Sequence, residues 1–95
     1  MPRNPFVWEV QVRREVLEDE VAKLRELPYT VWREMLSRTM TKSATGRDNR
    51  PYTLRITARP ESHDIRVTIV LESPGLRRKT MRQSFVITPD NRFRD

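Results

Sequence analysis

The sequence contains no cysteine, one histidine and two glycines. Without cysteine the chain has no disulfide, no thiolate nucleophile and no cysteine-ligated metal site, so a reducing compartment suits it. The two glycines, Gly46 and Gly75, are too far apart to form a glycine-rich loop that cradles phosphate groups. We therefore expect no cofactor.

Long apolar runs are missing as well. The first twenty residues have no uninterrupted apolar stretch of signal-peptide length, and no segment approaches the roughly 18 apolar residues of a membrane span. These absences predict a cytoplasmic protein without a membrane partner. The chain of 95 residues is 36% hydrophobic, which fits one domain over residues 1–95 with a thin core.

What the chain does have is an uneven distribution of charge. Residues 1–37 contain six basic and seven acidic side chains, whereas residues 38–95 contain thirteen basic and six acidic ones. The net charge of +6 therefore belongs to the second part. A pI near 10.7 favours anionic partners, although arginine-rich proteins in general share this property.

The acidic part predicts a long helix. Asn4-Pro5 resembles an N-cap followed by proline in the first turn, and apolar residues recur at helical spacing over residues 8–27. The expected core positions are Val10, Leu17, Val21 and Leu24, and the expected solvated ones are Glu18, Asp19, Glu20, Lys23, Arg25 and Glu26. One alternative stays open, because residues 6–12 also alternate as a β-strand would.

A second, shorter helix follows. Pro28 clashes with a continuing helix, and Thr30 is expected to cap a helix that runs to Leu36. Trp32 lies in this helix, and we assign it to core packing rather than to ligand or base stacking.

From Arg38 onward the apolar period changes to two, which predicts strands joined by short turns. The expected strands are residues 39–45, 52–59, 65–72 and 81–88, with turns at 46–50, 60–64 and 73–75. The predicted fold class is α+β, with an N-terminal long helix and a short helix packed on a four-stranded antiparallel β-meander.

Four segments carry a resemblance to known proteins. They are Leu27-Pro28-Tyr29, the Thr-Gly-Arg-Asp hairpin at 45–52, residues 64–67 and the Phe-Val-Ile-Thr-Pro-Asp-Asn ending within 84–93. Together they resemble a small family of uncharacterised bacterial proteins. Asn49 and Asn91 stand where that family usually has glycine, and asparagine tolerates the left-handed backbone. The resemblance implies this fold and a bacterial origin, and no activity.

Catalytic residues are hard to find. His63 lies beside Ser62 and Asp64 in a predicted turn, so a general-base pair is conceivable, but adjacent turn residues rarely converge. The acidic run 18–20 points in different directions around a helix and forms no metal or acid–base site. We predict that the protein is not an enzyme and holds no metal.

A better candidate is the outward face of the sheet, where arginine and threonine alternate with the core residues. The predicted polyanion-binding residues are Arg55, Arg66, Arg77, Arg78, Lys79 and Arg82, each contacting phosphate and none reading bases. The face lacks exposed aromatic side chains on which single-stranded bases stack. Arginine and threonine are also ordinary solvent-facing strand residues.

Protein association is the leading hypothesis. Val70 and Val86 add apolar atoms to the outward face, while Lys42 in the short strand 39–45 is a charge that discourages edge pairing. The first helix could also form a two-fold dimer. The sequence thus predicts a non-enzymatic protein-interaction module, with an unknown protein or a second copy as partner. Nucleic-acid or polyanion binding is the alternative.

Overall fold

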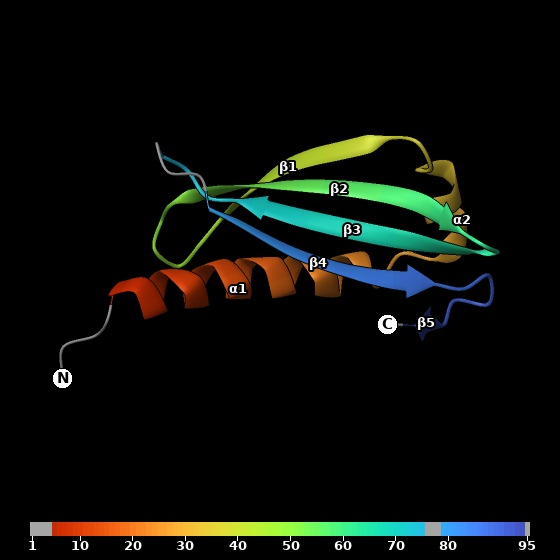
Figure 1. Cartoon of the computed structure of the whole chain (residues 1–95), viewed down its shortest axis with the longest axis horizontal. Helices are drawn as coiled ribbons and strands as arrows, with labels where there is room; N and C mark the ends of the chain where they lie inside the picture. The colour runs from red at the N-terminus through yellow and green to blue at the C-terminus, as the bar shows by residue number, and fades with distance from the viewer. Residues whose placement is uncertain (1–4, 76–78, 95) are drawn as a thin grey trace.

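The computed structural model describes residues 5–75 and 79–94 (Figure 1). Helix α1 spans Pro5–Leu24 and helix α2 spans Tyr29–Glu34. The strands are β1 (Thr39–Thr45), β2 (Pro51–Glu61), β3 (Asp64–Glu72), β4 (Thr80–Ile87) and β5 (Phe93–Arg94). They form one antiparallel sheet in the order β1-β2-β3-β4-β5. The predicted α+β meander is confirmed, with five strands in place of four.

The additional strand is β5, which could not be detected from the sequence. It has two residues, pairs with Val86 and Ile87, and follows a tight turn in which Thr88 N–H donates to Arg92 O at 2.8 Å. Two residues are too few to show alternation. The β2–β3 turn is also shorter than predicted, because β2 continues through Glu61 and leaves only Ser62 and His63 as the loop.

The N-terminal stretch 6–12 is helix, which settles the alternative that the sequence left open. The helix begins at Pro5, where the missing N–H costs nothing because first-turn donors have no partner within the helix. The predicted cap, Asn4, lies outside the described residues.

The buried stripe of α1 differs from the predicted one at four positions, because Val12, Val16 and Glu20 are buried and Val10 is not. Its apolar members are Val12, Val16, Leu17, Val21 and Leu24. Val10 is only half-buried. Glu20, which we expected in solvent, is 3% exposed because it lies one helical turn from both Val16 and Leu24.

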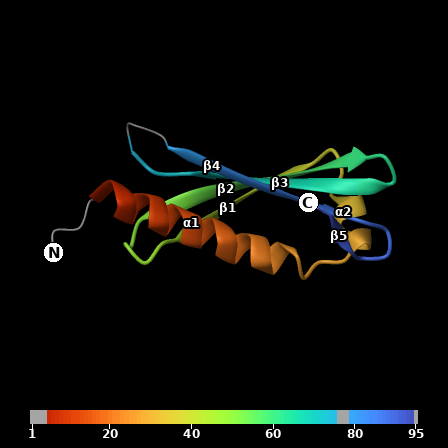
Figure 2. The same ribbon diagram turned by 60° about the horizontal axis from the view of Figure 1, so that its bottom comes forward.

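One face of the sheet forms the other half of the core. Alternate residues of β2 and β3 are buried, and α1 lies on the same side of the sheet, as Figure 2 shows. Trp32 of α2 is fully buried and meets Phe85 edge to face, with ring centroids 6.0 Å apart. The assignment of Trp32 to core packing is confirmed.

The β1–β2 loop is fastened to α1. A Cβ atom on Gly46 would lie 2.9 Å from Val12 Cγ1, so only glycine fits this close approach. The Arg47 guanidinium lies 4.1 Å from the centroid of the Trp8 ring, and its Nε is 2.9 Å from Glu15 Oε2. A stacked cation and an ion pair therefore hold the loop against the helix.

Asp48 completes this loop. The Tyr52 hydroxyl donates to Asp48 Oδ2 at 2.7 Å, and the Arg50 N–H donates to Asp48 Oδ1 at 3.2 Å. Burial, reinforced by the bond to Asp48, raises the pKa of Tyr52 to about 12. Asn49 has a φ of 62°, the left-handed conformation that asparagine tolerates.

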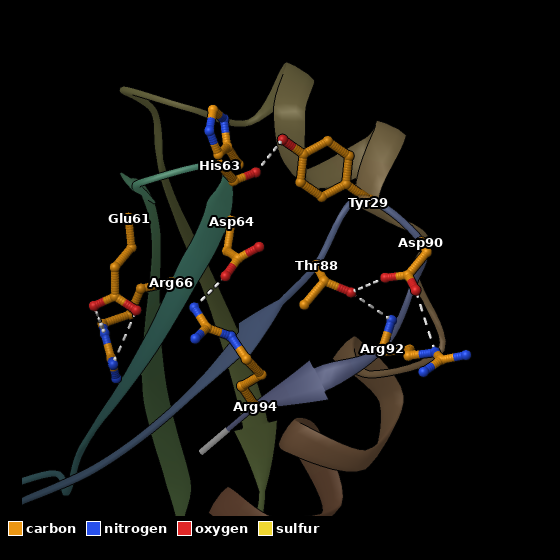
Figure 3. Close-up of polar contacts among 9 residues, drawn as sticks. All are labelled: Tyr29, Glu61, His63, Asp64, Arg66, Thr88, Asp90, Arg92 and Arg94. Carbon is orange, nitrogen blue, oxygen red and sulfur yellow. Dashed lines mark hydrogen bonds and ion pairs between the residues drawn. The ribbon is translucent and has the colours of Figure 1, made fainter.

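Helix α2 is capped from the other end of the chain. Its N-cap residue is Pro28, which offers no side-chain acceptor, and Thr30 lies inside the helix instead of capping it. The Tyr29 N–H donates to Asn91 Oδ1 at 2.8 Å. The Tyr29 hydroxyl donates to His63 O at 3.0 Å, a contact that Figure 3 shows. Tyr29 thus joins α2 to two turns of the sheet.

We predict that Asn91→Gly lowers the free energy of unfolding by about 1 kcal/mol, the net value of one hydrogen bond. Glycine accepts the φ of 65° at this position, so the loss reports the missing cap and not backbone strain. Urea denaturation measures the change. Asn91→Asp is the control, because it retains an acceptor oxygen and should stay close to wild type. Equal stability of Asn91→Gly and wild type would contradict the role of Asn91.

Candidate functional site: the open sheet face and its β1 edge

The sheet face turned away from α1 carries arginine and hydroxyl side chains in register. One row across four strands consists of Thr39, Thr57, Thr68 and Ser84. The row on one side contains Thr41, Arg55, Val70 and Arg82. The row on the other side contains Arg59, Arg66, Val86 and Arg94. We call this surface the open face.

The predicted arginines Arg55, Arg66 and Arg82 share the open face, so that part of the expected geometry is correct. Arg77 and Arg78 lie outside the described residues. Lys79 precedes β4 and is exposed, with its N–H donating to Ser73 Oγ at 3.0 Å.

Sequence reasoning left two arginines of the open face out of the candidate site. Arg59 lies four residues after Arg55 in β2 and therefore on the same face, so the alternation of the sequence could have identified it. Arg94 lies on the undetected strand β5.

Three arginines of the open face form ion pairs with carboxylates. Arg66 donates two hydrogen bonds to the Glu61 carboxylate, at 2.8 and 3.2 Å, and a third to Ser84 Oγ at 3.0 Å. The hydrogen bond from Arg66 holds the pKa of Glu61 below its usual value. Arg94 pairs with Asp64, as Figure 3 shows.

The third pair is looser, with Arg55 Nη2 lying 3.4 Å from Glu72 Oε1. Within residues 5–75 and 79–94, Arg59 and Arg82 have no carboxylate within ion-pair distance. The strands therefore bring five guanidinium groups and three carboxylates to the open face, a weaker positive charge than the sequence suggested.

Arg66 also has a structural role. Val86 lies on the open face and yet is 1% exposed. Its direct neighbours across the sheet are Arg66 and Arg94, whose aliphatic stems cover it while their charged ends reach Glu61 and Asp64. A substitution at Arg66 would therefore disturb packing as well as charge.

The β1 strand forms one border of the sheet, and β2 is its only partner strand in the described chain. Its open-face side chains are all exposed hydroxyl residues: Thr39, Thr41, Ser43 and Thr45. Lys42, the one charged residue of β1, lies on the opposite side, and its Nζ is 2.8 Å from Glu20 Oε2. We had expected Lys42 to discourage edge pairing; it lies on the side facing α1, its charge is offset by Glu20, and its side chain is 39% exposed.

The Glu20–Lys42 pair lies in a small polar cavity between α1 and β1. The cavity has a volume of about 250 Å³. It is lined by Val16, Asp19, Glu20, Lys23, Lys42, Ser43, Ala44 and Thr45. Glu20 Oε2 is in ionic contact with Lys42, but at an angle that does not make a hydrogen bond. Asp19 and Lys23, which lie one helical turn apart on α1, form no ion pair in the described chain.

The opposite border of the sheet is different. β4 pairs with β5 only at Val86 and Ile87, so residues 80–85 also have an edge without a partner strand among the described residues. That edge carries Arg82, which is exposed and has no carboxylate partner in the described chain. Charge of this kind discourages strand addition. The β1 edge has no such charge on its exposed side.

The histidine turn does not assemble a general-base pair. The Asp64 carboxylate is paired with Arg94, and His63 is exposed, with its carbonyl accepting from Tyr29. The described residues contain no cluster of three histidine or acidic side chains that could hold a metal ion.

Comparisons of the chain with family models, with curated proteins and with solved structures found no match. The family resemblance of the sequence therefore stays a prediction. Among the described residues, no helix is long and apolar enough to cross a membrane.

We predict that Lys42→Met destabilises the fold by about 2 kcal/mol or more, because it leaves the carboxylate of Glu20 buried without a counter-charge. Adding Glu20→Leu should recover most of the loss, since the pair is then replaced by apolar side chains. Chemical denaturation of the single and double variants measures this coupling. Lys23→Met removes an exposed lysine from the same cavity and should have little effect. If Lys42→Met were no more harmful than Lys23→Met, the pair would contribute nothing to stability.

Proposed function

We propose that this protein is an interaction module that binds a protein partner by adding a strand of that partner to the edge of β1. Cytoplasmic location and bacterial origin remain expectations from the sequence. The observation that carries the proposal is the position of Lys42, which lies on the side facing α1 in ionic contact with Glu20 and leaves the open-face side of a seven-residue edge strand without charge.

Strand addition needs an edge with accessible backbone groups and nothing that repels a neighbour. Every second residue of an edge strand directs both its N–H and its C=O away from the sheet, where a partner strand can satisfy them, and threonine side chains favour the extended conformation. Four hydroxyl side chains line the exposed side of β1. Other sheets protect such edges with an outward lysine, but here the lysine is held by Glu20.

A seven-residue peptide of alternating threonine and valine serves as a strand probe. We expect it to shift the backbone amide NMR signals of β1 and of the neighbouring β2, while those of β4 stay unchanged. A peptide of the same composition plus a central proline is the control, because proline removes a donor from the ladder. Shifts spread evenly over both sheet edges, or no shifts at all, would contradict the proposal.

Polyanion binding through the open face is the second candidate. It is favoured by the exposed Arg82 and Arg59, which have no carboxylate partner among the described residues. Hydroxyl groups of the Thr57–Thr68 row lie between these arginines and add further donors for phosphate oxygens.

Fluorescence anisotropy of labelled mixed-sequence DNA and RNA tests this candidate at about 50 and 200 mM salt, where phosphate-driven affinity falls steeply. We expect Arg55→Glu/Arg82→Glu to abolish binding. Arg66 is left intact because it covers Val86. The matched control is Arg14→Glu/Arg33→Glu, which makes the same change in net charge on the helices. Equal losses in both double variants would place binding elsewhere than on the open face.

A further inference from the structure

We infer that the strand that pairs with β1 is β1 of a second copy of this chain, so that two sheets join edge to edge about a two-fold axis. This inference rests on the proposed function, since it names the partner of the same edge. Isologous two-fold contacts are the commonest arrangement in soluble oligomers.

The first argument is the composition of the two sides of β1. A two-fold axis perpendicular to the sheet keeps the open face of both copies on the same side. In antiparallel self-pairing, an odd-numbered residue then always meets an odd-numbered one, whatever the register. The odd-numbered residues of β1 are all hydroxyl-bearing: Thr39, Thr41, Ser43 and Thr45. Every cross-strand pair on the open face is therefore hydroxyl to hydroxyl, a favourable combination.

The second argument is charge. On the side facing α1, β1 carries Met40, Lys42 and Ala44, and each Lys42 is neutralised by Glu20 of its own chain. Symmetric pairing of the seven residues places Lys42 opposite Lys42 of the second copy, and the ionic contact with Glu20 offsets the charge of each lysine. Self-pairing through β4 would instead bring together two copies of the exposed Arg82, a repulsive arrangement. The open-face side of β1, which has no charge, also offers nothing that would select a charged foreign strand.

The result would be a continuous sheet of ten strands, five from each copy, with both open faces side by side. A seven-residue pairing buries little surface compared with the roughly 1,200–2,000 Å² of stable interfaces. We therefore expect a weak dimer that forms as the protein concentration rises.

Sedimentation equilibrium over a concentration series tests the inference. The average mass of wild type should rise from 11.4 kDa toward twice that value. Thr41→Lys should keep the protein monomeric, because symmetric pairing of the seven residues centres on residue 42 and so brings both added charges close to the axis. Thr80→Lys places the same charge on β4 and should dimerise as wild type does. Circular dichroism checks that the variants are folded, which we expect because Thr41 and Thr80 are both exposed.

A charge swap makes the test sharper. Thr41→Glu alone should also be monomeric, whereas an equimolar mixture of Thr41→Lys and Thr41→Glu should recover a heterodimer, since opposite charges then lie across the axis. A wild type that stays monomeric at every concentration would overturn the inference. So would a dimer that survives in Thr41→Lys. If the strand probe still binds β1 of a monomeric protein, self-pairing fails while the proposed function stands.

Discussion

The packing of α1 and Trp32 against one face of a five-stranded sheet is the interaction on which the remaining structure depends. A chain with 36% hydrophobic residues can fill only one such layer, so the apolar side chains of β2 and β3 are used on the helix side. The opposite face then has to remain stable in water, and it does so with hydroxyl groups and with arginine–carboxylate pairs. The open face and the open edge of β1 are thus consequences of a thin core.

Long-range polar contacts hold the connecting segments to this core. Arg47 docks the β1–β2 loop on Trp8 and Glu15, while Tyr29 links α2 to Asn91 and to the carbonyl of His63. Phe93 of β5 packs edge to face on Phe85, with ring centroids 5.6 Å apart. Gly46, Arg47, Tyr29 and Asn91 all belong to the segments that carry the sequence resemblance, and each of them makes a contact that holds the fold together.

The sequence was most informative where periodicity extends over many residues. Alternation identified β2 and β3, and proline at position 28 marked the break between the helices. It was least informative where a residue's environment depends on a distant segment. Glu20 is buried only because α1 crosses the sheet near Lys42, and Asn91 caps a helix that begins 62 residues earlier in the chain. The alternation of residues along the strands predicted that Arg55, Arg66 and Arg82 share one face. It could not reveal that Arg66 forms an ion pair with Glu61.

The contact between Tyr29 and Asn91 has a consequence for synthesis of the chain. Helix α2 leaves the ribosome before the strands, and the side chain that caps it is translated 62 residues later. Chains are made from the N-terminus at roughly 5–20 residues per second, so α2 waits several seconds for its cap. The sheet strands emerge during that interval, which makes completion of α2 a late event in the formation of the domain.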